Sequence, residues 1–160
     1  MLGPENIHFR FATEEDAELY FNWANDDLVR KNSYNQKKLI YSDHLKWFQA
    51  KLRSQECFFY LFLNAKNEAI GQVRIDKVDN EVVIGISVDE RSRGKSYSPE
   101  MLMQACNDYL KNHPQAVIYA YIKTDNMASL NSFRKAGFTS EAIVTEYGIK
   151  SYQLHKQSGS

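Results

Sequence analysis

Cysteine, proline and glycine are scarce in this 160-residue sequence, which contains two, three and seven of them. Cys57 and Cys106 are too few for a disulfide framework and form no metal-ligand pattern, so we expect two buried, reduced thiols. The low proline and glycine content excludes a collagen-like or low-complexity chain. Excess positive charge is absent too, because twenty Lys and Arg residues balance twenty Asp and Glu residues. A chain of this balance is not expected to bind nucleic acid generally.

Long hydrophobic runs are also missing. No apolar stretch approaches the roughly 20 residues that span a bilayer, and Met1 to Arg10 lacks the apolar region of a signal peptide. We therefore expect a soluble, cytoplasmic protein with no membrane partner. The chain is 43% hydrophobic and 13% aromatic, enough for one packed domain. We place that domain at residues 1–156, with a disordered tail at 157–160.

Hydrophobic periodicity predicts a mixed α/β (α+β) fold with about seven strands and about four helices. Strands are expected at 7–11, 57–63, 69–75, 82–88, 116–122, 138–144 and 147–154. The three strands between 57 and 88 are typical of an antiparallel meander. Helices are expected after Thr13, from Ser42, from Ser98-Pro99 and from Asp125 or Asn126. The predicted order is β-α-α-β-β-β-α-β-α-β-β.

A basic, glycine-containing loop joins a predicted strand to a predicted helix. It reads Arg91-Ser-Arg93-Gly94-Lys95-Ser96. A helix N-terminus binds phosphate through its free N–H groups and its dipole, small residues let the backbone approach, and the three cations add countercharge. The loop matches neither the Walker A motif nor the dinucleotide fingerprint. It predicts an anionic phosphate ligand, and a solvated basic turn is the alternative.

Two segments resemble the GCN5-related N-acetyltransferase (GNAT) superfamily. Arg91-x-x-Gly94-x-Ser96 is similar to its Arg/Gln-x-x-Gly-x-Gly/Ala motif and departs from it at Ser96. The stretch from Asn126 to Phe138, Asn-x-x-Ser-x-x-x-Phe-x-Lys-x-Gly-Phe, resembles its second cofactor segment. The predicted order of elements is also that of the superfamily. The resemblance implies a GNAT-type, mostly antiparallel central sheet and an acyltransferase that uses acetyl-coenzyme A as cosubstrate, without a metal.

The resemblance also implies where the cosubstrate binds. Its pyrophosphate would lie on the amides of residues 93–96. Its pantetheine would follow the strand at 86–88, where that strand separates from its neighbour near Val88 and Ile118. The implied cofactor-binding residues are Ile86, Ser87, Val88, Arg91, Arg93, Gly94, Lys95, Ser96, Asn126, Ser129 and Phe133.

For the catalytic groups the sequence offers alternatives. Many members of the superfamily carry a tyrosine, thought to protonate the leaving thiolate, where this chain has Phe133. Ser129 or Ser132, water, or unassisted departure of a thiol of pKa about 8.5 would have to replace it. Glu81 is the candidate general base, acting through water; an ordinary exposed turn glutamate is the alternative, and His44 is another candidate base.

The acceptor site of the superfamily lies between the first two strands. Here residues 22–33, Asn-Trp-Ala-Asn-Asp-x-x-Val-Arg-Lys-Asn-Ser, and the stretch His44-x-x-Trp47-Phe48 resemble UDP-4-amino-4,6-dideoxy-sugar N-acetyltransferases of pseudaminic acid and surface-glycan pathways. Cations would meet the diphosphate, aromatic rings would stack, and amides would bind hydroxyls. The expected substrate-binding residues are Trp23, Asn25, Arg30, Asn32, Tyr34, His44 and Trp47. Core packing is the alternative for both tryptophans.

Two other functions stay open. A ribosomal-protein N-terminal acetyltransferase shares the tryptophan and the layout, but a peptide amine favours an acidic cleft, whereas this segment mixes Asp26 and Asp27 with four basic residues. A non-catalytic module that binds coenzyme A would fit the loss of tyrosine at Phe133. The chain is expected to be a monomer or a homodimer, with the last strand as a possible dimer edge.

Overall fold

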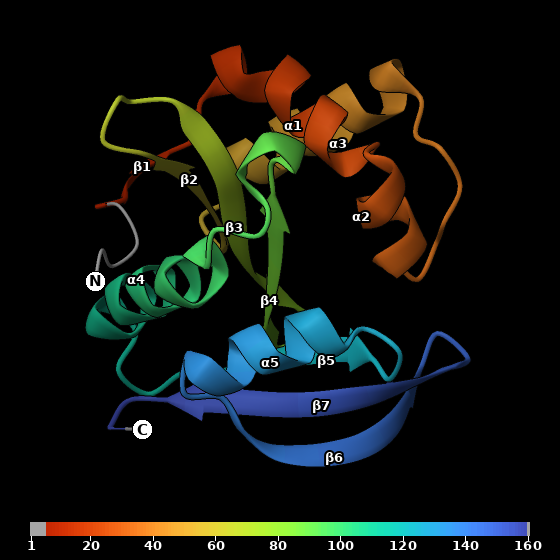
Figure 1. Cartoon of the computed structure of the whole chain (residues 1–160), viewed down its shortest axis with the longest axis vertical. Coiled ribbons are helices and arrows are strands. Elements are labelled where there is room, and N and C mark those ends of the chain that lie inside the picture. Colours follow the sequence, from red (N-terminus) through yellow and green to blue (C-terminus); the bar gives the residue numbers. More distant parts are fainter. Residues whose placement is uncertain (1–5, 160) are drawn as a thin grey trace.

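The structure, a computed structural model, describes residues 6–159. Its sheet has the strand order β1-β2-β3-β4-β5-β7-β6 (Figure 1). All neighbouring strands are antiparallel except β4 and β5, which are parallel. The strands are β1 (His8–Phe11), β2 (Cys57–Leu63), β3 (Ala69–Val78), β4 (Glu81–Val88), β5 (Val117–Lys123), β6 (Thr139–Glu146) and β7 (Ile149–Gln157). The predicted sheet, mixed and mostly antiparallel, is confirmed.

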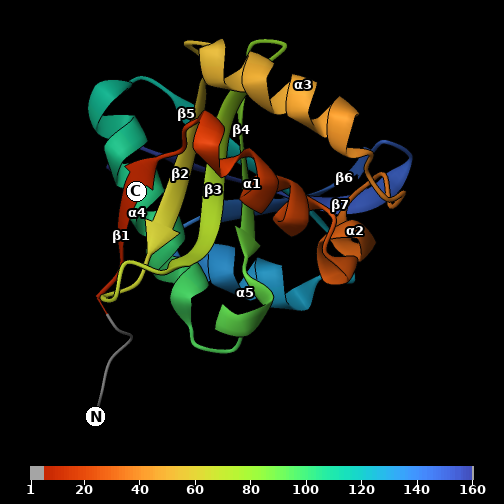
Figure 2. The ribbon, with the colours of Figure 1, turned by 90° about the horizontal axis from the view of Figure 1, so that it is seen from above.

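Five α-helices cover the two faces of this sheet within the described residues. They are α1 (Ala17–Ala24), α2 (Asp27–Asn32), α3 (Tyr41–Arg53), α4 (Tyr97–Asn112) and α5 (Met127–Lys135), with 3₁₀ turns η1 (Glu14–Asp16) and η2 (Glu90–Ser92). Figure 2 shows α1 and α3 across β2–β4, and Figure 1 shows α4 and α5 on the opposite side. The sequence did not predict α2, so the structure has one helix more than expected.

Alternation along β2 divides the core in two. Tyr60 and Phe62 pack with α4 and α5, whereas Phe59 and Leu61 pack with α1 and α3. Successive side chains of a strand point to opposite faces, so this continuous apolar run is buried on both, as predicted. Cys57 and Cys106 are also buried and unpaired, as expected.

The parallel pair β4–β5 is held together only at its beginning. Val82 faces Ile118 and Val83 faces Tyr119, and beyond these residues the two strands diverge. The rest of β4, through Val88, therefore has no strand partner on that side. A separation of the strands was predicted, but its position was partly wrong, because Ile118 lies at the paired end and not at the open one.

Two helix beginnings differ from the predicted caps. Ile40 occupies the N-cap position of α3, so Ser42 lies inside its first turn. Ser96 occupies the N-cap position of α4, so Ser98 and Pro99 are its second and third residues. Proline is tolerated there because N–H groups of the first turn have no partner within the helix.

The described residues cover most of both predicted termini. Gln157 belongs to β7 and pairs with Val117, so the strand extends one residue into the predicted tail. The segment expected to lack a signal peptide, Met1 to Arg10, is described only from residue 6, and Ser160 also lies outside the described residues. Across residues 6–159, no helix is long and apolar enough to cross a membrane.

Candidate active site

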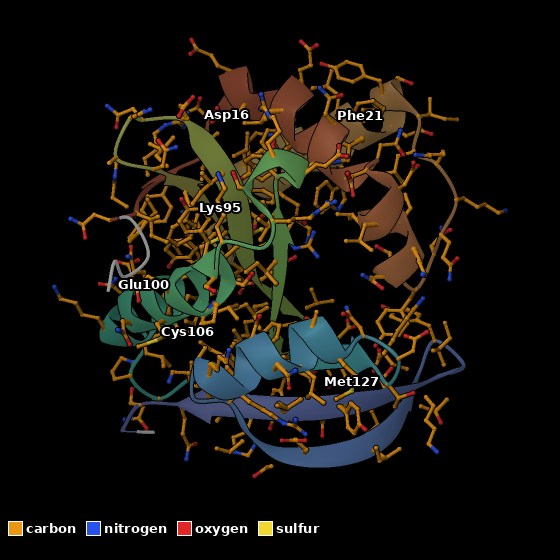
Figure 3. The ribbon with its side chains drawn as sticks, in the orientation of Figure 1. Asp16, Phe21, Lys95, Glu100, Cys106 and Met127 are labelled. Atoms are coloured by element: carbon orange, nitrogen blue, oxygen red, sulfur yellow. The ribbon has the colours of Figure 1, made fainter. Side chains whose placement is uncertain are left out.

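A cleft of about 710 Å³ opens where β4 leaves β5. Residues of β3 and β4 form its floor, residues of α1, α2 and α3 form one wall, and the loop before α4 together with α5 forms the other. In Figure 3, Lys95 marks the loop before α4 and Met127 the first residue of α5, the two helix ends that border the cleft. The separated strands thus expose backbone at the centre of the cleft.

The basic loop presents backbone at the N-terminus of the 16-residue helix α4. Gly94 has φ +76°, and a Cβ added there would meet no atom within 4 Å. Ser96 has φ +62°, a left-handed conformation that favours glycine. The motif therefore departs from the superfamily pattern at a residue whose backbone conformation explains why glycine is common there.

The three cations of this loop have different surroundings. Lys95 and Arg93 line the cleft, and Arg93 Nη2 lies 2.6 Å from a carboxylate oxygen of Asp26. Burial of Asp26 is outweighed by the hydrogen bonds from Arg93 and from the α2 backbone, so the pKa of Asp26 lies below its usual value. Arg91, a predicted cofactor residue, lies outside the cleft lining, with an 86% exposed side chain that contacts Asp89.

Trp23 is a core residue at the edge of the cleft. It is 6% exposed, and its Nε1 donates a hydrogen bond of 2.8 Å to Asp89. Burial of Asp89 opposes ionisation, but its bonds from Trp23 and Arg91 hold its pKa below the usual value. This arrangement matches the alternative of core packing, because the indole N–H is already engaged and little of the ring is exposed.

The second predicted segment lies where its pattern suggests. Asn126 caps α5, its side-chain oxygen accepting from the Ser129 N–H at 3.2 Å, and Gly137 follows the helix with φ +94°. Asn126, Ser129 and Phe133 all line the cleft, as do Ile86, Ser87 and Val88. Phe133 is 3% exposed and packs edge-on against Phe138. Sequence reasoning missed Asn131 and Lys135, which line the same wall.

The predicted base lies just behind the cleft. Glu81 is not among the lining residues, but Tyr121 is. Tyr121 Oη donates a 2.5 Å hydrogen bond to Glu81 Oε1 and accepts one of 2.9 Å from Gln153 Nε2. Burial, followed by the bond to Glu81, raises the pKa of Tyr121 to about 12. Sequence reasoning missed Tyr121, although Tyr119, Tyr121 and Lys123 alternate with the core residues of β5 and indicate a second functional face.

The part of the cleft lined by α1, α2, α3 and β3, called the acceptor half below, contains polar atoms without a hydrogen-bond partner among residues 6–159. His44 Nδ1, Tyr20 Oη and Gln72 Oε1 are buried and form no hydrogen bond with residues 6–159, and all three residues line the cleft. Burial, then the charges of Arg30 and Arg74, lowers the pKa of His44. Trp47 is 37% exposed, and the Arg74 guanidinium carbon lies 5.1 Å from the centre of its ring.

Three other predicted acceptor residues stabilise the segment around α2. Arg30 lines the cleft, but its guanidinium donates to Ala24 O at 2.7 Å and to Asn35 O at 2.9 Å. The side-chain amide of Asn25 donates a hydrogen bond to the carbonyl of Leu39 and accepts one from the Leu39 N–H. Tyr34 bonds to Ser151 through its hydroxyl. Asn25 and Tyr34 lie outside the cleft lining, whereas Asn32 and His44 belong to it.

The charged side chains that line the cleft are all basic. Among residues 6–159, its lining contains no aspartate or glutamate. Within the same residues, no group of three or more His, Cys, Asp or Glu side chains is placed to hold a metal ion. The basic lining residues are Arg30, Arg74, Arg93, Lys95, Lys123 and Lys135.

Comparison with known proteins agrees with this architecture. Residues 6–139 match the family model described as an acetyltransferase (GNAT) domain. A spermidine N-acetyltransferase from Vibrio cholerae, solved with CoA and spermine, is 13% identical, with TM-score 0.83 over 94% of each chain. The aminoglycoside acetyltransferase AAC(6')-Ib is 16% identical: solved with coenzyme A it gives TM-score 0.79 over 96% of this chain and 95% of that chain. Solved with ribostamycin and coenzyme A it gives 0.81 over 96% and 94%. No curated protein matches the sequence.

Proposed function

The chain belongs to the GNAT acetyltransferase family and is an acetyl-coenzyme A-dependent N-acetyltransferase, and we propose that its acceptor is an anionic small molecule carrying an amine, a nucleotide-linked amino sugar. The observation that supports this acceptor is the charge of the cleft away from the cofactor loop: Arg74 and Lys123 belong to its lining, and no carboxylate of residues 6–159 does. The family assignment favours an enzyme over a non-catalytic module that binds coenzyme A.

The residues present fit coenzyme A. The N-terminus of α4 offers free N–H groups to a pyrophosphate, and at Gly94 the loop leaves open space where other residues have a side chain. Lys95 and Arg93 add positive charge beside it. The open edge of β4 offers backbone groups to the amides of pantetheine. Bound there, the thioester supplies an activated acetyl group, and the protein holds it beside the acceptor half of the cleft.

The charge of the cleft argues against a cationic acceptor. The structurally similar enzymes were solved with spermine and with ribostamycin, which both carry several amines. Like charges repel, and the repulsion grows in a partly desolvated cleft. An N-terminal peptide also arrives as a cation and favours carboxylates around its amine. A diphosphate, in contrast, binds more tightly with each basic side chain that it contacts, because each can form a charge-assisted hydrogen bond.

Arg74 and Trp47 are the pair best placed to bind such an acceptor. Arg74 extends from β3 into the acceptor half, and its guanidinium contacts the Trp47 ring but forms no hydrogen bond or ion pair with residues 6–159. A free guanidinium binds phosphate with paired hydrogen bonds, and a half-exposed indole stacks on an aromatic base. The unpartnered atoms of His44 and Gln72 suit sugar hydroxyls. Arg74 thus replaces Arg30, whose donors are already engaged, as the expected diphosphate contact.

A thiol-release assay over five amines tests the acceptor: a UDP-linked 4-amino-4,6-dideoxy sugar, the free amino sugar, spermidine, kanamycin and an N-terminal peptide. We expect the fastest turnover with the nucleotide sugar. Arg74→Gln should raise its KM about tenfold or more, since a charged hydrogen bond contributes about 1.5–3 kcal/mol, and should change KM for the free sugar little. Arg134→Gln, which removes an arginine paired with Glu141 outside the cleft lining, is the matched control.

Faster turnover of spermidine, kanamycin or the peptide would contradict the anionic acceptor. Equal KM increases for the nucleotide sugar and the free sugar would contradict the diphosphate contact alone. Neither result would affect the assignment to the acetyltransferase family.

A further inference from the structure

A chain of hydrogen bonds connects the cleft to a carboxylate behind it. Tyr121 belongs to the cleft lining at the point where β4 and β5 have separated. Its hydroxyl donates to Glu81 and accepts from Gln153, which faces it across the β5–β7 pair. A phenolic oxygen has two acceptor lone pairs, so one remains available on Tyr121.

Glu81 also borders a second hollow. This hollow, of about 840 Å³, lies beside the β3–β4 turn at Asp79 and Asn80 and does not share Tyr121 with the cleft. The carboxylate of Glu81 is half-buried at the start of β4. Its hydrogen bond to Tyr121 connects it to the cleft, and it also lines the second hollow.

We propose that Tyr121 and Glu81 form a proton relay for the acceptor amine, an inference that rests on the proposed N-acetyltransferase function. Amines are mostly protonated near pH 7, so an acceptor must lose a proton before it attacks. The N–H bond breaks and its electron pair stays on nitrogen as the attacking lone pair. The proton binds Tyr121 Oη while the phenol's own proton passes to Glu81 Oε1. The neutralised Glu81 then releases that proton to water in the second hollow.

The tyrosine serves as a relay and not as the base. With its pKa raised to about 12, Tyr121 remains protonated at neutral pH. It can therefore accept a proton from the amine only if it donates its own proton at the same time. Glu81 accepts that proton along an existing short hydrogen bond. Gln153 fixes the orientation of the hydroxyl by donating to it, which leaves the phenol proton pointing at the carboxylate. Gln153 is therefore a positioning residue.

Other ionisable groups lie around the pair. Glu146 acts on Tyr121 by charge, after Glu81. The remaining groups, which line the two hollows, are Arg74, Lys123, Glu56, Lys77, Asp79, His113 and Tyr119. Since Arg74 and Lys123 lie on the cleft side, they disfavour the ammonium form of the acceptor and assist its deprotonation.

Single-turnover acetyl transfer in Tyr121→Phe, Glu81→Gln and the double variant tests the relay. The acceptor is whichever amine of the panel the wild-type enzyme acetylates, so failure of the nucleotide-sugar proposal leaves this test intact. General-base assistance contributes about 10²–10⁴-fold, so each single variant should be about 100-fold slower or more at pH 7. The double variant should be no slower than the singles, because both residues serve one step.

The pH profile separates a relay from a structural role. At high pH the acceptor is already neutral, so the deficit of both variants should shrink as pH rises. Tyr147→Phe removes the hydroxyl of an 81% exposed tyrosine that lines neither hollow, so it is the matched control and should keep the wild-type rate and profile.

Three results would overturn the relay. The first is a wild-type rate in Tyr121→Phe. The second is a slow Tyr121→Phe beside a wild-type Glu81→Gln, which would mean that Tyr121 protonates the thiolate instead. The third is multiplicative losses in the double variant. In contrast, a wild-type enzyme that acetylates no amine would refute the proposed function itself.

Discussion

Gly94 is the position where a single substitution tests the cofactor site most directly. Its φ of +76° is left-handed, and a Cβ there meets no atom within 4 Å. Gly94→Val therefore introduces no clash in the free protein and costs only backbone strain, about 1–2 kcal/mol or more for a β-branched residue. A domain with a free energy of unfolding of about 5–15 kcal/mol tolerates that cost. With ligand, however, the new side chain occupies the open side of the loop that a pyrophosphate would approach.

We therefore expect Gly94→Val to weaken coenzyme A binding about tenfold or more, equivalent to about 1.4 kcal/mol. Gly148→Val is the matched control. Gly148 lies in the turn between β6 and β7, with φ +75° and no atom within 4 Å of an added Cβ. Both variants carry the same backbone strain, so urea denaturation should show similar losses of stability.

Titration calorimetry with coenzyme A should then distinguish them. The Gly148→Val protein should bind like wild type, and the Gly94→Val protein should not. Wild-type affinity in the folded Gly94→Val protein would refute the placement of the pyrophosphate on this loop. Equal losses of affinity in both variants would mean that strain is transmitted through the fold and would refute it as well.

Four further predictions follow from the contacts described above. Ser96→Gly should raise the free energy of unfolding by about 1 kcal/mol by removing left-handed strain at φ +62°, as urea denaturation would measure. Arg30→Gln should lower it by about 1–3 kcal/mol because its hydrogen bonds to backbone carbonyls are lost, whatever the acceptor. Phe133→Tyr should leave the single-turnover rate unchanged or raise it modestly, and a large loss would mean that the buried ring tolerates no hydroxyl. The pKa of Asp16 is lowered mainly by the hydrogen bond from Arg10. Its contribution to stability is therefore present above the unfolded-state pKa of about 4 and is lost as the pH falls through the lower pKa of the folded state. Asp16→Asn should make the free energy of unfolding depend less on pH in this range.

Much of the fold could be predicted because its signals are local. The apolar run at Cys57–Leu63 has strand length, and Asp79-Asn80 marks the turn between two strands, where both residues adopt positive φ. Asn126 and Gly137 cap and end α5 as their residue types indicate. Each of these features depends on residues within a few positions of each other, which is the range that periodicity and capping describe.

The helix α2 could not be predicted from periodicity because it has only six residues and buries none of them. Its N-terminus does carry a local signal, since Asp26 accepts from the N–H groups of Leu28 and Val29. Its orientation depends on tertiary contacts. Arg93 binds Asp26, and Lys123, the last residue of β5, donates to the carbonyl of Lys31.

The two halves of the site were predictable to different degrees for the same reason. Cofactor residues lie in two contiguous motifs, so a strand, a loop and a helix end carry nearly all of them into the cleft, and only Arg91 points elsewhere. The predicted acceptor residues come from three helices and from the connections that follow α1 and α2. Asn25 and Tyr34 have the right chemistry, but Asn25 bonds to Leu39 of the loop before α3, and Tyr34 of that loop bonds to Ser151.

The charge of the cleft could not be read from the composition, which balances to zero. The fold produces the imbalance by pairing carboxylates away from the lining: Asp76 binds Lys51, and Asp26 neutralises only Arg93. Arg74 is the cation left without a carboxylate partner on the floor between them. A cationic acceptor would meet this guanidinium with nothing to offset it, whereas an anionic one would supply the missing partner. The acceptor is therefore best sought among anionic amines, and Arg74, which no sequence motif marks, is the residue that should determine the choice.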